Sequence, residues 1–198
     1  MTTPIEDLLA RIHALQEELE AEFQKKREEF AYVIEGKRVR FAQELQARQH
    51  QYRVGLLRYL RTSRVAVLLT APVVYSGFVV FALMDLFVTV YQRLCFPLYG
   101  IPVVRRADHL VFDRADLPYL NAIERFNCFY CSYGNGVASY LREVAARTEQ
   151  YWCPIKHSRR LLGMHERLPR FFEYGDAEAY RQGLERLRRD LGAEPPPP

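Results

Sequence analysis

The first third of the chain carries a narrow apolar stripe among charged and amide side chains. Apolar residues recur at helical spacing from Ile5 to Leu19. From there they recur every eleven residues in two series: Leu19, Phe30, Phe41, Tyr52 and Phe23, Ile34, Leu45, Leu56. A period of eleven corresponds to about 3.67 residues per turn, which keeps the stripe on one face of a nearly straight helix. The pattern predicts one long charged helix over residues 1–64.

A stripe this narrow cannot form a hydrophobic core by itself, so the helix needs something to pack against. One interpretation is a coiled coil, in which the partner is a second copy of the chain or another protein. The other is an arm that folds back on the chain's own C-terminal half. A helix running through residues 5–71 would be about 100 Å long at 1.5 Å per residue, and an arm of that length is hard to fold back completely.

The second part is a run of 27 residues, 65–91, that contains a single charged residue. About 20 apolar residues suffice to cross the hydrocarbon of a bilayer, so the run predicts a transmembrane or re-entrant helix. A buried helix in a soluble all-α protein is the alternative. Three residues argue against a simple, straight transmembrane helix. Pro72 and Gly77 are expected to kink or break the helix, and Asp85 adds a carboxylate that is costly in lipid. The mean hydropathy of −0.23 excludes a polytopic membrane protein.

The remaining residues, 93–192, read as a helical domain that carries the Cys and His residues. Asp116 is a candidate cap for a helix ending near Ser132, and Gly134-Asn135-Gly136 is typical of a turn. A second helix would run to about Trp152, so the two are expected to form an antiparallel hairpin. Asp176 is a candidate cap for a last helix, and residues 193–198, which end in four prolines, are expected to be a disordered tail. The predicted fold class is all-α.

The densest cluster of candidate ligands is Cys128-x-x-Cys131 followed by Cys153-Pro-Ile-Lys-His157. Three thiolates and one imidazole can bind zinc tetrahedrally, and the same set can hold an iron–sulfur cluster. In a regular hairpin, however, Cys131 and Cys153 would lie roughly 25–30 Å apart. A shared site therefore needs either a chain that folds back or a second subunit. The alternatives are cysteines buried as small apolar core residues, or a redox dithiol formed by Cys128 and Cys131.

Two weaker patterns accompany this cluster. Glu124 and Glu149 would face each other across the hairpin and could share a proton or a metal, although salt bridges to Arg125 or Arg147 explain them better. The run of residues 147–160 mixes aromatic and basic side chains, which suits either a phosphate or lipid headgroup or simply a solvated basic face. The net charge of +4 does not indicate nucleic acid binding. No sequence pattern identifies catalytic residues, which remain unknown.

Two strings in this domain resemble a family of bacterial proteins of unknown function: NCFYCSYGNG at residues 127–136 and RTEQYWCPIKH at residues 147–157. The resemblance extends along the chain and implies no activity. It places the protein in bacteria, and hence the apolar run in the inner membrane. Basic residues flank both ends of that run, so charge does not orient it, but clustered free thiols favour a cytoplasmic Cys/His domain.

Two hypotheses follow from the sequence. The first is a membrane-anchored metal-binding accessory or redox protein, with zinc or an iron–sulfur cluster held by Cys128, Cys131, Cys153 and His157. The second is a non-catalytic membrane-bound coiled-coil scaffold. Its partners would be the lipid bilayer and a second copy or another protein.

Overall fold

The computed structural model describes residues 4–29, 32–35, 38–41, 43–159 and 161–194. It divides into two compact units, one formed by Met1–Thr62 with Asp113–Arg125 and the other by Ser63–Phe112 with Phe126–Pro198. The described residues are mainly helical and include one two-stranded β-hairpin. The all-α fold class is therefore confirmed.

The first unit does not contain the continuous helix expected over residues 1–64. Helix α1 covers Pro4–Glu29, and the antiparallel strands β1 (Tyr32–Glu35) and β2 (Arg38–Phe41) follow it. Helices α2 (Gln43–His50), α3 (Leu56–Thr62) and the 3₁₀ helix η1 (Asp113–Asp116) complete the unit. The strand sequences YVIE and RVRF are rich in β-branched and aromatic residues, and this local preference overrides the eleven-residue period. Phe30, one member of that period, lies outside the described residues.

Helix α4 (Val65–Tyr99) opens the second unit and is longer than the apolar run that predicts it. It contains Pro72 without ending there, so the expected break is wrong. Gly77 serves close packing instead, because a Cβ at this position would lie 2.5 Å from the hydroxyl oxygen of Tyr130. The helix ends at Gly100, whose φ of 66° is left-handed and suits glycine.

Helix α6 (Ala122–Trp152) replaces the predicted antiparallel hairpin with one continuous helix. Asn121, not Asp116, caps it: the Asn121 side chain accepts hydrogen bonds from the backbone N–H groups of Ile123 and Glu124, at 2.9 and 3.0 Å. Gly134 and Gly136 do not form a turn. The positive-φ glycines among the described residues are Gly100, Gly163 and Gly175.

The two glycines within α6 allow neighbouring groups to approach the helix closely. A Cβ on Gly134 would lie 2.6 Å from the ring of Phe81 in α4. A Cβ on Gly136 would lie 2.8 Å from the carbonyl oxygen of His109 in α5 (Arg106–His109). These contacts explain why glycine is required here although the backbone stays helical.

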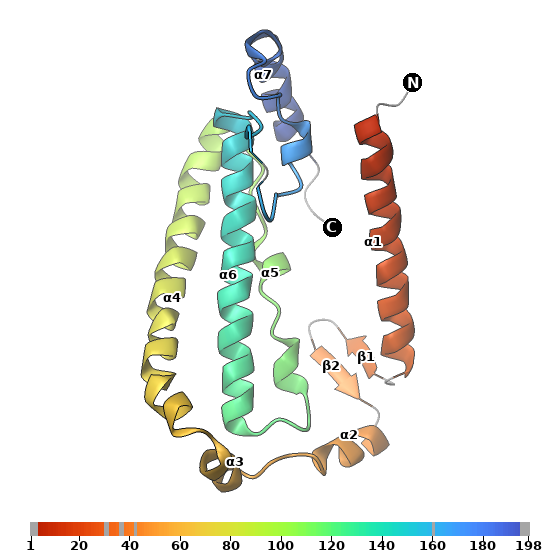
Figure 1. The fold of residues 1–198 in the computed structure, drawn as a ribbon, viewed down its shortest axis with the longest axis vertical. Coiled ribbons are helices and arrows are strands. Elements are labelled where there is room, and N and C mark those ends of the chain that lie inside the picture. The colour runs from red at the N-terminus through yellow and green to blue at the C-terminus, as the bar shows by residue number, and fades with distance from the viewer. Residues whose placement is uncertain (1–3, 30–31, 36–37, 42, 160, 195–198) are drawn as a thin grey trace. The chain divides into compact units, whose positions relative to one another are not determined.

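Helices α4 and α6 run side by side in the same direction (Figure 1). Tyr75 packs on Phe126 near one end, with ring centroids 5.2 Å apart, and Tyr99 packs on Tyr151 at the other end, also at 5.2 Å. Between Gly100 and Phe112 the chain returns alongside both helices (Figure 1). The core is buried between these three segments and α7, and its largest members are Tyr140, Phe96 and Leu191.

The chain ends in a small cap on this core. It comprises the 3₁₀ helix η2 (Leu168–Arg170) and α7 (Ala177–Gly192). The predicted cap of the last helix is confirmed, because Asp176 Oδ1 accepts a hydrogen bond from the Ala179 N–H at 2.9 Å. The predicted disordered tail is wrong at Glu194, which forms ion pairs with Arg167 and Arg170, while residues 195–198 lie outside the described residues.

Candidate functional site

Helix α4 exposes most of its large apolar side chains, whereas a helix in the core of a soluble protein buries them. Its buried residues are Asp85, Val88, Gln92 and Phe96, so two of the four are polar. Its exposed large apolar residues are Val65, Val67, Leu68, Leu69, Val73, Val74, Val79, Val80, Leu83, Leu86, Phe87, Val90, Leu94 and Leu98. None of its most apolar 18-residue window is buried inside the protein. The helix is long and apolar enough to cross a membrane, and its outer surface is the one that lipid would contact.

Asp85 is neutralised by an ion pair that the sequence pattern did not indicate. Arg106 donates from Nε to Asp85 Oδ1 at 2.8 Å and from Nη2 to Oδ2 at 2.6 Å. The hydroxyl of Tyr133 donates to the same carboxylate at 3.0 Å. The side chain of Asp85 is only 9% exposed, so this bidentate pair lowers the cost of placing a carboxylate on an apolar helix. A carboxylate within an apolar run is a signal to search for such a partner, but only the fold identifies Arg106.

Gln92 anchors the returning segment to the helices. Its side-chain oxygen accepts a hydrogen bond from the Val104 N–H at 2.9 Å, and its amide donates to the Val104 carbonyl at 3.2 Å. The same amide contacts the hydroxyl of the buried Tyr140 in α6. The backbone N–H and C=O of Val104, in a non-helical stretch, thereby find hydrogen-bond partners in a side chain of α4. Buried backbone groups need such partners wherever water is excluded.

The four predicted metal ligands do not come together in one chain. Cys128 and Cys131 lie in the first half of α6, whereas Cys153 and His157 follow its end. Cys131 and Trp152 are 21 positions apart on this straight helix, which is about 30 Å. The described residues include no group of three or more His, Cys, Asp or Glu side chains that could hold a metal ion. This donor set therefore does not fit a single ion bound by one chain.

The expectation of buried structural cysteines is also wrong, because none of the four is fully buried. Cys131 and Cys153 are exposed, and Cys95 and Cys128 are partly buried; all four are free thiols. The interpretation of Cys128 and Cys131 as a redox dithiol stays a prediction.

The predicted carboxylate pair is separated for the same reason. Glu124 and Glu149 belong to one helix, so no second helix brings them face to face. Glu124 accepts a hydrogen bond from the Asn121 N–H at 2.8 Å and so completes the helix cap. Glu149 pairs with Nε2 of His165 at 2.9 Å.

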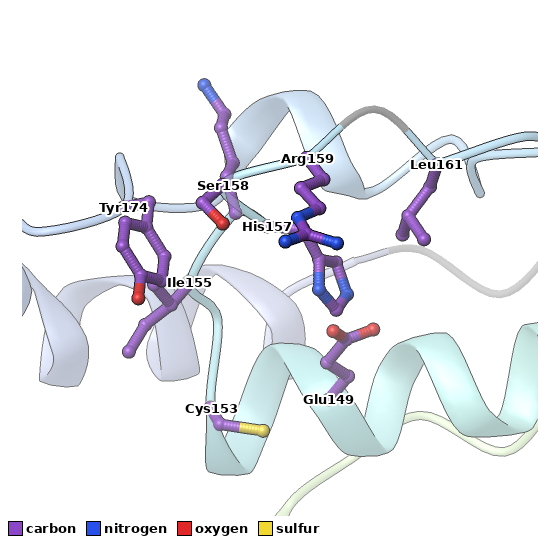
Figure 2. Close-up of a pocket in the computed structure, with 9 residues that line it drawn as sticks. Glu149, Cys153, Ile155, His157, Ser158, Arg159, Leu161 and Tyr174 are labelled. Carbon is purple, nitrogen blue, oxygen red and sulfur yellow. The ribbon is translucent and has the colours of Figure 1, made fainter.

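A pocket of about 510 Å³ lies where the chain leaves α6. Figure 2 shows the carboxylate of Glu149 and the ring of His157 pointing toward each other, with the guanidinium of Arg159 beside the ring. Lys156, which also lines the pocket, forms an ion pair with Glu173 at 2.5 Å. The pocket is basic and open, and the headgroup interpretation of this run stays a prediction.

The most tightly bonded polar cluster in the second unit is centred on Arg167. Its guanidinium donates to Glu143, Gln150 and Glu194 at 2.8–3.1 Å, and its side chain is only 10% exposed. Burial by itself would raise the pKa of Glu143 and of Glu194, but hydrogen bonds and charge from Arg167 outweigh it and hold both pKa values below normal. The cluster fastens η2 and the end of α7 to α6.

The comparisons with known proteins add no relative: no family model matches the chain, and no curated protein or solved structure matches it.

Proposed function

We propose that this protein is a non-catalytic membrane scaffold, in which α4 inserts into the lipid bilayer and α1 binds a second copy of the chain. The observation that supports the proposal best is the arrangement of α4, which buries Asp85 and Gln92 and exposes most of its large apolar side chains.

The amount of exposed apolar surface argues for a lipid environment. Fourteen large apolar side chains of α4 are exposed, by 45% or more of their surface. Fully burying one such side chain contributes roughly 1.5–3 kcal/mol, so half-burying fourteen amounts to on the order of 10–20 kcal/mol. That is as large as the entire folding stability of a typical domain, about 5–15 kcal/mol. Water is therefore an unfavourable surrounding for this helix, and hydrocarbon suits it.

The surface of α1 supports the second part of the proposal. Its apolar stripe is exposed in the structure and consists of Leu8, Ile12, Leu15, Leu19 and Phe23. The spacing of three and four residues is that of a coiled-coil seam, which buries its side chains against an equivalent seam. Since every copy presents the same stripe, a second copy is the partner that the chain itself supplies.

We further propose that the protein lies in a bacterial inner membrane with Cys153 and His157 on the cytoplasmic side. Exposed free thiols persist in a reducing compartment, and the thiol of Cys153 is both exposed and free.

Membrane insertion is tested by expressing the full chain and washing the membranes with alkaline carbonate and then with urea. The protein should stay in the pellet and be released only by detergent. Leu83→Lys places a charge on the exposed surface of α4, and a central lysine disfavours insertion by about 2.5–3.5 kcal/mol. Leu57→Lys in α3 is the matched control, since Leu57 is also exposed. Release of the unaltered protein by carbonate would refute the proposal.

Two further measurements test the scaffold role. In detergent, the unaltered chain should sediment as a dimer, and Leu15→Glu should shift it to monomer while Gln16→Glu, which adds the same charge beside the stripe, should not. Metal analysis of protein purified without oxygen distinguishes the scaffold from the metal-binding hypothesis. Stoichiometric zinc or iron would favour the metal-binding hypothesis over the scaffold.

A further inference from the structure

The first half of α6 includes a long stretch without charged residues. The sixteen residues Phe126–Leu141 contain no Asp, Glu, Lys or Arg, and Arg125 and Arg142 flank them. They extend over about 24 Å of helix. Asn, Ser, Tyr and Gly residues lower the hydropathy of the stretch. Among the described helices, α4 alone is both long enough and apolar enough to cross a membrane.

This stretch packs directly on the part of α4 whose outer surface is exposed. The ring of Phe78 stacks on those of Phe129 and Tyr133, at centroid distances of 5.9 and 5.4 Å. Glycine at position 77 of α4 and at position 134 of α6 brings the helices close, as small residues do in membrane helix pairs. If α4 lies in lipid at this level, the adjoining stretch of α6 lies at the same depth.

Charged side chains of α4 and of the returning segment lie next to this stretch, and they occur in pairs. Asp85 pairs with Arg106, and Asp108 lies 3.6 Å from Arg105. The four charges sum to zero. Irregular backbone at membrane depth is tolerated where it is buried in protein or lines a water-filled cavity. Val104 is buried and bonded to Gln92. The side chains of Arg105, Arg106 and Asp108 are 36–51% exposed, so that side of the segment has to face water.

Cys131 and Ala138 of α6 are exposed, small and uncharged. Asn135 lies between them, and its side-chain amide donates to the carbonyl of Cys131 at 2.8 Å, which reduces its cost in an apolar surrounding. The next charge along the helix is Arg142, which donates to the carbonyl oxygens of Gly163 and Met164 in the C-terminal cap. The aqueous part of the molecule therefore begins at Arg142.

We propose that Phe126–Leu141 of α6 lies in the hydrocarbon beside α4 and exposes Cys131 and Ala138 to lipid acyl chains. This inference rests on the proposed insertion of α4. It changes the membrane part of the protein from one helix to a pair of helices with a polar segment packed against them, and it places the lipid boundary of α6 at Arg142.

The experiment uses three positions spaced by seven residues: 131, 138 and 145. Seven residues are nearly two helical turns, so the three positions share one face of α6 and lie about 10 Å apart in depth. All three are exposed in the structure. Each is made the sole cysteine of the full-length chain, using the native Cys131, Ala138→Cys or Ala145→Cys, and carries a nitroxide label in liposomes. Collisions with oxygen, which concentrates in lipid, are compared with collisions with a water-soluble nickel chelate.

Labels at 131 and 138 should collide frequently with oxygen and rarely with nickel, and the label at 145 should show the reverse. Frequent nickel collisions at 131 would place this surface in water, and rare collisions with both reagents would show that protein covers it; either result overturns the inference. Val79→Cys on α4 separates the two proposals, because Val79 is 64% exposed. If 79 is in lipid and 131 is not, only the inference fails; if 79 is in water, the proposed anchor fails as well.

Discussion

The substitution Gly136→Ala tests whether α6 is one closely packed helix. At an open position in a helix, replacing glycine with alanine stabilises by about 1 kcal/mol, because alanine loses less backbone entropy. At position 136 the added Cβ would lie 2.8 Å from the carbonyl oxygen of His109, and 3.0 Å from Cγ and 3.2 Å from Cα of Leu110. Two of these atoms belong to the backbone and cannot rotate away.

The structure sets both the sign and the size of the effect. Overpacking a tight site costs about 1–3 kcal/mol, and contact with backbone atoms puts this site near the upper end. After subtracting the helix-propensity gain of about 1 kcal/mol, a net destabilisation of about 2 kcal/mol remains. For a protein of this size, each kcal/mol lowers the melting temperature by about 2–4 °C, so the expected decrease is about 4–8 °C.

Asn135→Ala is the matched control, since Asn135 is the exposed neighbour in the sequence. In a continuous helix this change should be neutral or stabilise by about 0.5 kcal/mol, despite the loss of one local hydrogen bond. In a turn of the kind that Gly134-Asn135-Gly136 resembles, alanine would lose the tolerance of asparagine for positive φ and destabilise the protein.

Thermal unfolding of the full chain in detergent, followed by circular dichroism at one fixed scan rate, measures both variants. Gly136→Ala should melt below the unaltered protein and Asn135→Ala at or above it. An increase of the melting temperature in Gly136→Ala would refute the close approach of the returning segment. A large decrease in Asn135→Ala would refute the continuous helix.

Three other outcomes follow from the polar contacts of the second unit. Arg167→Met removes the cation shared by Glu143 and Glu194 and should destabilise the protein by about 2–3 kcal/mol. This is less than the roughly 3–5 kcal/mol for breaking an isolated buried ion pair, because neighbouring arginines remain. Hydrogen exchange should show α7 opening first, and unchanged protection of α7 would contradict the prediction. The pKa values of Glu143 and Glu194 are lower in the folded protein than the usual 4.5. Their stabilisation is therefore complete above pH 4.5 and is lost as the pH falls through the lower folded pKa values, so the melting temperature should be steady from pH 7 to 5 and drop below pH 4.5. The drop should shrink when both residues are changed to glutamine. Asp85→Asn, combined with Arg106→Gln in a double-mutant cycle of melting temperatures, should reveal a coupling of about 1 kcal/mol, and additive effects would show that the pair does not form.

Several features of this protein follow from the sequence alone. The run 65–91 predicts a long apolar helix, because the length and composition needed to cross a membrane are local properties of the chain. The last helix is equally local, since Asp176 precedes it and its own side chain forms the cap. In both cases the determining residues are neighbours in the chain, so a pattern of short range is sufficient.

The tertiary structure decided the remainder, because residues distant in the sequence supply the determining contacts. Gly134 and Gly136 suit a turn by local preference, but α6 continues through both, and there they leave room for Phe81 and the His109 carbonyl. The continuous helix separates the predicted metal ligands. Asp85 is an isolated charge in the sequence and becomes half of an ion pair once the chain returns along α4. The pairing partner lies 21 residues away, and no spacing rule links the two, because the intervening residues 100–105 belong to no regular element.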